Sequence, residues 1–304
     1  MPQDKSSEHN TFVSTYKAEI ILMIITLSWG LSFPLIKISL NFISPFLFLF
    51  LRLFITFTVF YFIFRKKPDL TAIKEWKYGV ILGIFLFFGF AFQTIGLKFT
   101  TASKSAFITG TSLIVIPFAQ YFILKLKPRP ENIIGAVIVL AGLYILSEAY
   151  FSDPNKGDLL TLISALSFAV YVVLLNKYTT EKNFNILAFG QFLTMSVLSL
   201  VLVLIFEVFI YSEIFIKMNE VLILTLFYTS VFSTLISIIL ITKYQRKTTP
   251  LRASIIYNME SVSAAFFSYI ILGELLNFNQ LTGVVIMIAG LFISEFYMYF
   301  KIKT

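Results

Sequence analysis

The strongest constraint on this chain is a series of long apolar segments separated by short polar connections. A helix of about 20 apolar residues crosses the hydrocarbon core of a bilayer, and ten segments approach that length. They cover approximately residues 19–40, 44–64, 78–97, 103–124, 130–147, 158–176, 185–210, 220–242, 250–272 and 277–300. Hydrophobic residues make up 58% of the 304 residues, more than a soluble domain of this size can bury. We therefore predict an all-α integral membrane protein with ten transmembrane helices.

Lysine and arginine residues are distributed unequally between the two sides of this predicted bundle. Eighteen of them lie in connections on one side, together with both termini, and five lie on the other side. The positive-inside rule then places both termini in the cytoplasm, for a multi-pass protein of the cytoplasmic (inner) membrane. The net charge of +8 is thus mainly a topology signal, and we expect no nucleic-acid partner.

The two ends of the chain are predicted to be short cytoplasmic tails, residues 1–16 and 301–304. The first tail is polar, and no small-residue cleavage site follows the apolar segment after it. We therefore expect a retained first helix and not a removed signal peptide.

Several kinds of chemistry are excluded or disfavoured by residue content. The chain has no cysteine, and its single histidine, His9, lies in the polar N-terminal tail. Disulfides, thiolate or histidine metal sites and a cysteine nucleophile are therefore absent, and we expect no metal, no cofactor and no enzymatic activity. A Ser–Lys dyad at Lys104 and Ser105 is the remaining, weak enzyme alternative. No P-loop is present to support ATP-driven transport.

The two halves of the sequence form an internal repeat. A shift of 148 residues superposes Thr100-Thr101 on Thr248-Thr249, Tyr121 on Tyr269, and Ala141-Gly142-Leu143 on Ala289-Gly290-Leu291. A shift of 139 relates the earlier parts, placing Leu27-Ser28 on Leu166-Ser167 and Arg52 on Gln191. We predict two five-helix repeats, residues 17–150 and 151–300. Because five is odd, the second repeat is inverted in the membrane, as in carriers that open alternately to either side.

Several stretches resemble EamA-type members of the drug/metabolite transporter (DMT) superfamily. These are "LSWGLSFPLIK" in the first segment, "TTAS" at 100–103 with "AFITG" at 106–110, and "YQRKTTP" at 244–250 with Glu260 and "LGE" at 272–274. The chain departs from the family pattern at Ser261, where proline is usual, and at Lys125-Leu126, where Gly-Glu is common. The resemblance implies ten helices around a central cavity, lined mainly by helices 1, 3, 4, 6, 8 and 9, and transport of small metabolites, often by export.

The leading functional prediction is a secondary transporter for a small amphipathic metabolite, such as an amino acid, a nucleoside or a drug-like compound. Its partners would be that substrate, the lipid bilayer and protons as the coupling ion. Alternating access with export is favoured, and uptake by the same fold is the first alternative. A lipid scramblase or a membrane scaffold without transport activity is a further alternative.

Glu260 is the first candidate for substrate binding or proton coupling. It lies near the centre of segment 250–272, where an ionised side chain costs at least about 2.5 kcal/mol unless it meets water or a partner. The alternative is a structural carboxyl group that is hydrogen-bonded between helices. Its repeat equivalent is Ser112, so a cavity at this level would be chemically asymmetric.

Trp29 is the second candidate, because it lies near the middle of its segment and not at an interface, where belt aromatics lie. It is predicted to stack on a substrate or to enclose it, although a large core side chain is an equal alternative. Other polar residues on the expected lining helices are Gln93, Thr109, Ser112, Tyr171, Tyr228 and Tyr257. Each could instead be a hydrogen-bonding residue between helices. Together they predict an aromatic, moderately polar pocket.

Arg52 and four glycines are predicted to be structural. Arg52 lies deep in segment 44–64, and the resemblance leaves that helix outside the cavity lining, so a buried structural charge is favoured. Gly135, Gly142, Gly283 and Gly290 recur at seven-residue spacing in the fifth and tenth segments. That spacing places them on one helix face, where they allow close helix packing.

Overall fold

The computed structural model describes residues 5–64, 73–146, 155–210, 214–275 and 277–303. Within these ranges, side chains are described from residue 15 to residue 294, except those of residues 73 and 74. The side chains of most of the first predicted tail, including His9, and of the second tail lie outside the described part. Among the described residues the fold is all-helical, apart from one isolated antiparallel bridge between Ile43 and Ile216.

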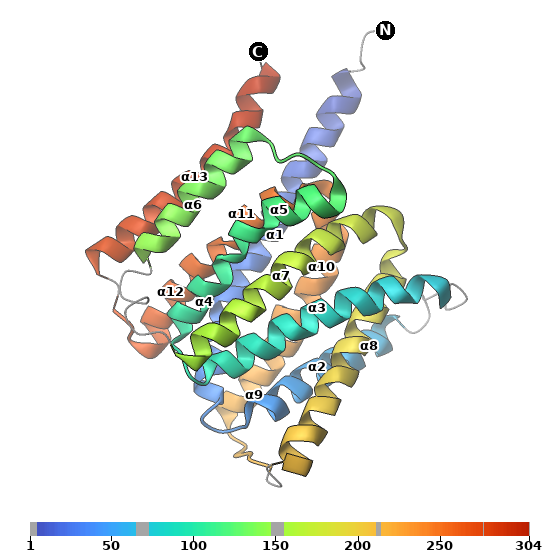
Figure 1. The fold of residues 1–304 in the computed structure, drawn as a ribbon, viewed down its shortest axis with the longest axis vertical. Coiled ribbons are helices and arrows are strands. Elements are labelled where there is room, and N and C mark those ends of the chain that lie inside the picture. Colours follow the sequence, from blue (N-terminus) through green and yellow to red (C-terminus); the bar gives the residue numbers. More distant parts are fainter. Residues whose placement is uncertain (1–4, 65–72, 147–154, 211–213, 276, 304) are drawn as a thin grey trace.

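The helices follow one another with short connections (Figure 1). In chain order they are α1 (Lys5–Ser39), α2 (Pro45–Phe64), α3 (Ile73–Leu97), α4 (Ala102–Gly110), α5 (Ser112–Leu124), α6 (Pro130–Leu146), α7 (Lys156–Glu181), α8 (Phe184–Val203), η1 (Leu204–Ile210), α9 (Glu220–Phe227), η2 (Tyr228–Ile236), α10 (Ser237–Tyr244), η3 (Gln245–Lys247), α11 (Pro250–Tyr257), α12 (Met259–Leu272) and α13 (Phe278–Lys303).

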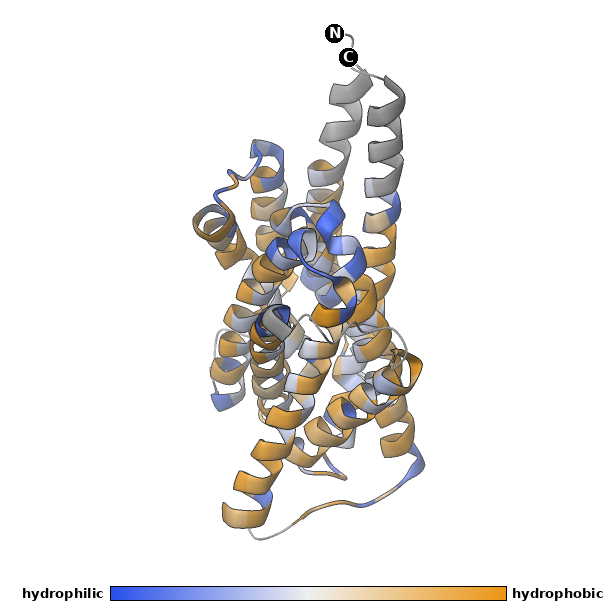
Figure 2. Ribbon diagram, turned by 90° about the vertical axis from the view of Figure 1, so that its right-hand side faces the viewer, coloured by the Kyte–Doolittle hydropathy of each residue, from blue (hydrophilic) through white to orange (hydrophobic). Residues whose placement is uncertain are grey.

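Eight helical segments in the described part of the chain are long and apolar enough to cross a bilayer. Two further apolar helices are shorter, namely α6 with 17 residues and the Phe278–Ser294 part of α13. The all-helical membrane fold predicted from the sequence is confirmed, and the ten-helix count remains a prediction. Figure 2 shows long hydrophobic stretches along most of the helices, as expected for helices that cross a bilayer.

Several predicted segments are not single regular helices. The segment Ala102–Leu124 breaks between α4 and α5, and Pro250–Leu272 breaks between α11 and α12. At both breaks short i→i+3 bonds replace regular ones, from the Thr111 amide to the Ile108 carbonyl and from the Ser261 amide to the Asn258 carbonyl. The segment Glu220–Lys247 contains the π-helix η2, and Phe184–Ile210 ends in the π-helix η1.

Close helix packing on glycine joins α6 to α13, which lie side by side in Figure 1. A Cβ on Gly142 would lie 2.7 Å from the Gly283 carbonyl oxygen, and one on Gly135 would lie 2.9 Å from that of Gly290. Only glycine allows the two backbones to approach this closely. All four predicted packing glycines thus lie at this one interface.

Candidate functional site

The candidate site is a central pocket between helices from both halves of the chain. Its walls come from α1, α2, α3, α4, α5, α7, η2, α10, α11 and α12. The breaks at Gly110 and Asn258 both lie in its lining. A helix break at membrane depth frees backbone polar groups, which is tolerated where they are buried in protein or line a cavity.

Seven of the eight predicted binding residues line this pocket. They are Trp29, Gln93, Thr109, Ser112, Tyr171, Tyr257 and Glu260. The eighth, Tyr228, is not among the lining residues: its hydroxyl group donates to the Ser28 carbonyl at 2.7 Å, and its ring stacks on Phe232. Tyr228 therefore joins η2 to α1, the interhelical role that was its alternative.

Glu260 lies in the first turn of α12, directly after the break, and its side chain is half-buried in the pocket wall. The break brings its helix end to the middle of the bundle. Arg52 supplies a basic group to the same lining. Among the described residues no ion pair within 4.0 Å joins the two. The pocket thus holds one acidic and one basic group that are not in direct contact.

Arg52 contributes to the pocket, although the resemblance placed its helix outside the cavity. Its side chain is only 2% exposed, and its Nε donates to the Thr234 hydroxyl at 2.8 Å. Its guanidinium carbon lies 4.5 Å from the centre of the Phe90 ring, a cation–π arrangement. Because α2 packs against η2, this long side chain of α2 reaches the pocket lining. The structural role of Arg52 stays a prediction.

The π-helix η2 supplies several polar groups to the pocket wall. The Ser233 carbonyl accepts from Nε1 of Trp29 at 2.8 Å, and the Ser233 hydroxyl accepts from Ser32 at 2.8 Å. The Trp29 ring also lies against Tyr257, with centroids 5.6 Å apart. π-Turns inside helices expose carbonyl groups in this way and often occur at functional sites. The hydrogen bond and the tilted ring contact together hold Trp29 in one orientation.

Four other predicted residues are held by hydrogen bonds to one another or to their surroundings. Gln93 donates to Thr109 at 3.1 Å, so that these two lining residues form one polar unit. The Tyr171 hydroxyl donates to Gln191 at 2.9 Å, and the Tyr257 hydroxyl donates to Gln245 at 3.0 Å. Both tyrosines present mainly their rings to the pocket, and their polar ends are already satisfied.

Asn258 is a lining residue that the sequence interpretation missed. Its amide nitrogen donates to the Ser254 carbonyl at 3.0 Å, but its Oδ1 has no hydrogen-bond partner in the described part of the chain. The residue is 3% exposed. A buried acceptor without a partner carries an unfavourable free energy that a donor on a bound solute would relieve. The sequence feature that could have identified Asn258 is its repeat equivalence to Gly110 at the 148-residue shift.

The described residues include no group of three or more histidine, cysteine, aspartate or glutamate side chains that could hold a metal ion. The pocket instead presents aromatic rings, hydroxyl and amide groups and one charge of each sign. Such a lining suits reversible binding of a small solute with both polar and apolar parts.

Comparison with known proteins gives consistent matches. The model of the EamA-like transporter family matches twice, over residues 16–148 and 155–296. An "Uncharacterized transporter" of Archaeoglobus fulgidus is 32% identical over 91% of this chain and 85% of its own length. A "Probable amino-acid metabolite efflux pump" of Salmonella typhimurium is 23% identical over 92% and 95%. A crystal structure with 14% identity has the same fold, with a TM-score of 0.74 over 92% of this chain and 97% of that one.

Proposed function

Because the chain belongs to the EamA-like transporter family of the DMT superfamily, we propose that it is a secondary transporter for a small amphipathic metabolite, working by alternating access. The family assignment confirms the resemblance seen in the sequence, and the multi-pass membrane fold agrees with it. Export across the cytoplasmic membrane is the favoured direction, and one relative named as an efflux pump supports it.

The observation that carries the proposal is the central pocket with Glu260 and Arg52 in one lining. Ionisable side chains within a membrane are costly and are retained mainly where they serve substrate or ion pathways. An acidic and a basic group that are not bonded to each other can each receive an oppositely charged substrate group. The rings of Trp29, Phe90 and Phe168 would cover its apolar part. An amino acid has charged groups of both signs, whereas a nucleoside or a neutral drug-like compound would use hydrogen bonds to the same two side chains and to the hydroxyl and amide groups of the lining.

An inverted repeat is the second support for alternating access. The family model matches each half of the chain once. Two local features recur at the 148-residue shift, namely the threonine N-cap, at Thr101 and Thr249, and the left-handed residue at the helix end, at Lys125 and Gly273. The helix break recurs nearly in register, directly after Gly110 in the first half and at Asn258 in the second. Two matching halves in inverted orientation can exchange conformations and thereby exchange which side is open.

This proposal includes ten membrane crossings with α6 and α13 as the fifth and tenth, and both termini in the cytoplasm. Glu260 is proposed to carry the coupling proton, because it is the acidic group among the lining residues that the structure describes. Its carboxyl group would bind a proton or a cationic substrate group in alternation. Because the proton and the substrate compete for this one carboxyl group, the movement of protons is coupled to the movement of substrate without any further binding site.

The test compares small-molecule profiles of medium and cytosol for cells that make the parent protein, Glu260→Gln or no protein. Lys127→Gln is the matched control, because it removes one charge from an exposed residue far along the sequence from the pocket lining. A compound that accumulates outside only with the parent and the control would identify the substrate class and support export. Uniform profiles across media that contain candidate nutrients would contradict the proposed transport of a metabolite.

A further inference from the structure

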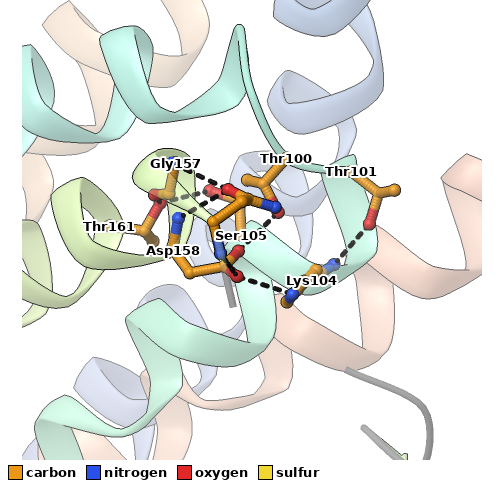
Figure 3. Close-up of polar contacts among 8 residues, drawn as sticks. Thr100, Thr101, Lys104, Ser105, Gly157, Asp158 and Thr161 are labelled. Carbon is orange, nitrogen blue, oxygen red and sulfur yellow. Dashed lines mark hydrogen bonds and ion pairs between the residues drawn. The ribbon is translucent and has the colours of Figure 1, made fainter. Parts of the chain in front are cut away.

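A buried ion pair joins α4 to α7 (Figure 3). Nζ of Lys104 lies 2.6 Å from Oδ2 of Asp158, and the Thr100 hydroxyl donates to Oδ1 of the same carboxylate at 2.8 Å. The side chains of Lys104 and Asp158 are 10% and 12% exposed. Figure 3 shows the hydroxyl group of Thr100, in the turn before α4, and the amino group of Lys104, in the first turn of α4, both directed toward Asp158.

A second buried ion pair joins α1 to α11. Nε of Arg252 lies 3.0 Å from Oε1 of Glu19, and its Nη2 donates to Oε2 at 3.1 Å. The Thr248 hydroxyl donates to Oε1 at 3.2 Å. These two charged side chains are 8% and 7% exposed. A threonine, a cation and a carboxylate thus form the same arrangement twice.

The two arrangements are related by the internal repeat. The shift of 148 residues places Lys104 on Arg252 and Thr100 on Thr248, and the shift of 139 places Glu19 on Asp158. All three positions of one cluster therefore have their equivalents in the other. The sign of each charge, the hydrogen bonds and the burial are preserved between the two clusters, although a lysine in one corresponds to an arginine in the other and an aspartate corresponds to a glutamate.

The two ion pairs lie at opposite ends of the pocket. Glu19 precedes the lining residue Trp29 by about 15 Å along α1, at 1.5 Å per residue, and Asp158 precedes the lining residue Phe168 by the same distance along α7. In an inverted repeat these two equivalent positions lie toward opposite sides of the membrane. The Glu19 cluster therefore lies on the side of the pocket toward the N-terminus of α1, and the Asp158 cluster lies on the opposite side, where α7 begins.

We propose that Glu19–Arg252 and Lys104–Asp158 are the gate contacts of the transporter, which close opposite mouths of the central pocket and separate one at a time during transport. This inference rests on the proposed alternating-access function. A buried ion pair holds its helices together, because removal of one partner leaves an unpaired buried charge. When one mouth of the pocket opens, water reaches the cation and the carboxylate of the ion pair at that mouth. Water then solvates both charges, so that this pair can separate while the pair at the closed mouth stays together.

The test measures access to the pocket and needs no substrate. The chain has no cysteine, so Ser112→Cys places a single thiol in the pocket lining. A membrane-impermeant maleimide is applied to sealed right-side-out and inside-out vesicles. Lys104→Gln is expected to raise the labelling rate about tenfold from the face at which α7 begins, and Glu19→Gln about tenfold from the opposite face. The matched controls are Lys98→Gln and Arg246→Gln, which neutralise exposed cations near the respective ends.

Two results would overturn the proposal. One is an unchanged labelling rate from both faces in folded variants, and the other is an equal rise from the same face for both variants. Labelling that shifts as expected in a protein that moves no solute would retain the gates and reject the transport function. Transport of a solute by variants whose labelling rate is unaltered would support the transport function and reject the gates.

A cross-link provides a second measurement if the single-charge variants fail to fold. The hydroxyl oxygens of Ser105 and Thr161, on α4 and α7 beside the first pair, lie 3.4 Å apart. Cysteines at both positions are close enough for a disulfide. If this end opens during transport, oxidation should stop transport and a reductant should restore it. Full transport by the oxidised protein would show that the contact is static and would reject the gate.

Discussion

Gly110 lies directly against Asn258, its equivalent in the second half of the chain. A Cβ at Gly110 would lie 2.7 Å from Oδ1 of Asn258 and 3.1 Å from the Ser261 hydroxyl oxygen. Each residue marks the break in its own membrane segment, so the two breaks meet at the point where α4 and α12 cross. A contact between equivalent residues is expected where the axis of a two-fold repeat passes through the molecule.

Gly110→Val is therefore expected to destabilise the fold by about 1–3 kcal/mol, because its side chain would overlap Asn258 and Ser261. The measurement is the thermal unfolding midpoint in detergent, together with transport in vesicles. Asn258→Ala in the same protein should recover part of the loss, since it removes the nearest atom. Gly273→Asn is the control, because a Cβ there meets nothing within 4 Å and asparagine tolerates its positive φ. Equal stability of Gly110→Val and the parent would contradict the close contact.

Trp29→Phe should separate the two contacts of this side chain. The variant keeps an aromatic ring against Tyr257 but loses the hydrogen bond to the Ser233 carbonyl, at an expected cost of about 1 kcal/mol. Trp29→Ala also loses the ring and should cost about 3–5 kcal/mol. Unfolding midpoints of the two variants check this order. If Trp29→Phe were as damaging as Trp29→Ala, the hydrogen bond to η2 would be the dominant contribution instead.

Arg52→Lys should lower stability by about 1.5–3 kcal/mol, although it retains the charge. Lysine has no planar guanidinium to lie over Phe90 while donating to Thr234 and Ser233 at once. Unfolding in detergent measures the loss, and Lys127→Gln again serves as the exposed control. A midpoint equal to that of the parent would show that the charge alone is sufficient at this position.

Glu260→Gln should abolish the pH dependence of transport while leaving folded protein in the membrane. Glutamine has nearly the same shape but cannot exchange a proton, so a carrier coupled through this residue loses its response to the proton gradient. Initial rates across a series of imposed pH gradients provide the measurement. Arg52, Tyr171 and Tyr257 are the other ionisable groups in the described lining, and all three remain in the variant. An unaltered pH profile would refute the coupling role.

Much of the site could be predicted from the sequence, because polar side chains inside apolar segments are few and must be buried or face a cavity. That argument identified Glu260, Trp29 and Gln93, which lie in one pocket. It failed for Tyr228, because a hydroxyl group inside a membrane is satisfied equally well by a neighbouring carbonyl. A polar residue that lines the pocket and one that only bonds two helices together therefore look the same in the sequence.

Long-range pairing and local helix geometry were the parts that sequence patterns did not predict. Lys104 was considered for a catalytic dyad at a helix end beside water, yet it is buried and bonded to Asp158 on a distant segment. The breaks at Gly110 and Asn258 lie inside apolar runs whose composition is compatible with continuous helices. Both features depend on which helices pack together, and that information is not local.

The orientation of the chain can be tested by labelling single cysteines in intact cells. Lys98→Cys and Lys127→Cys are exposed and lie in consecutive predicted connections, so they should face opposite sides of the membrane. We expect an impermeant maleimide to label the cysteine at 98 in intact cells and the cysteine at 127 only after permeabilisation, since the basic connections face the cytoplasm. A cysteine added after Thr304 should behave like the one at 127. Its labelling in intact cells, with the cysteine at 127 still protected, would imply an odd number of crossings after residue 127, which would contradict the ten-helix arrangement.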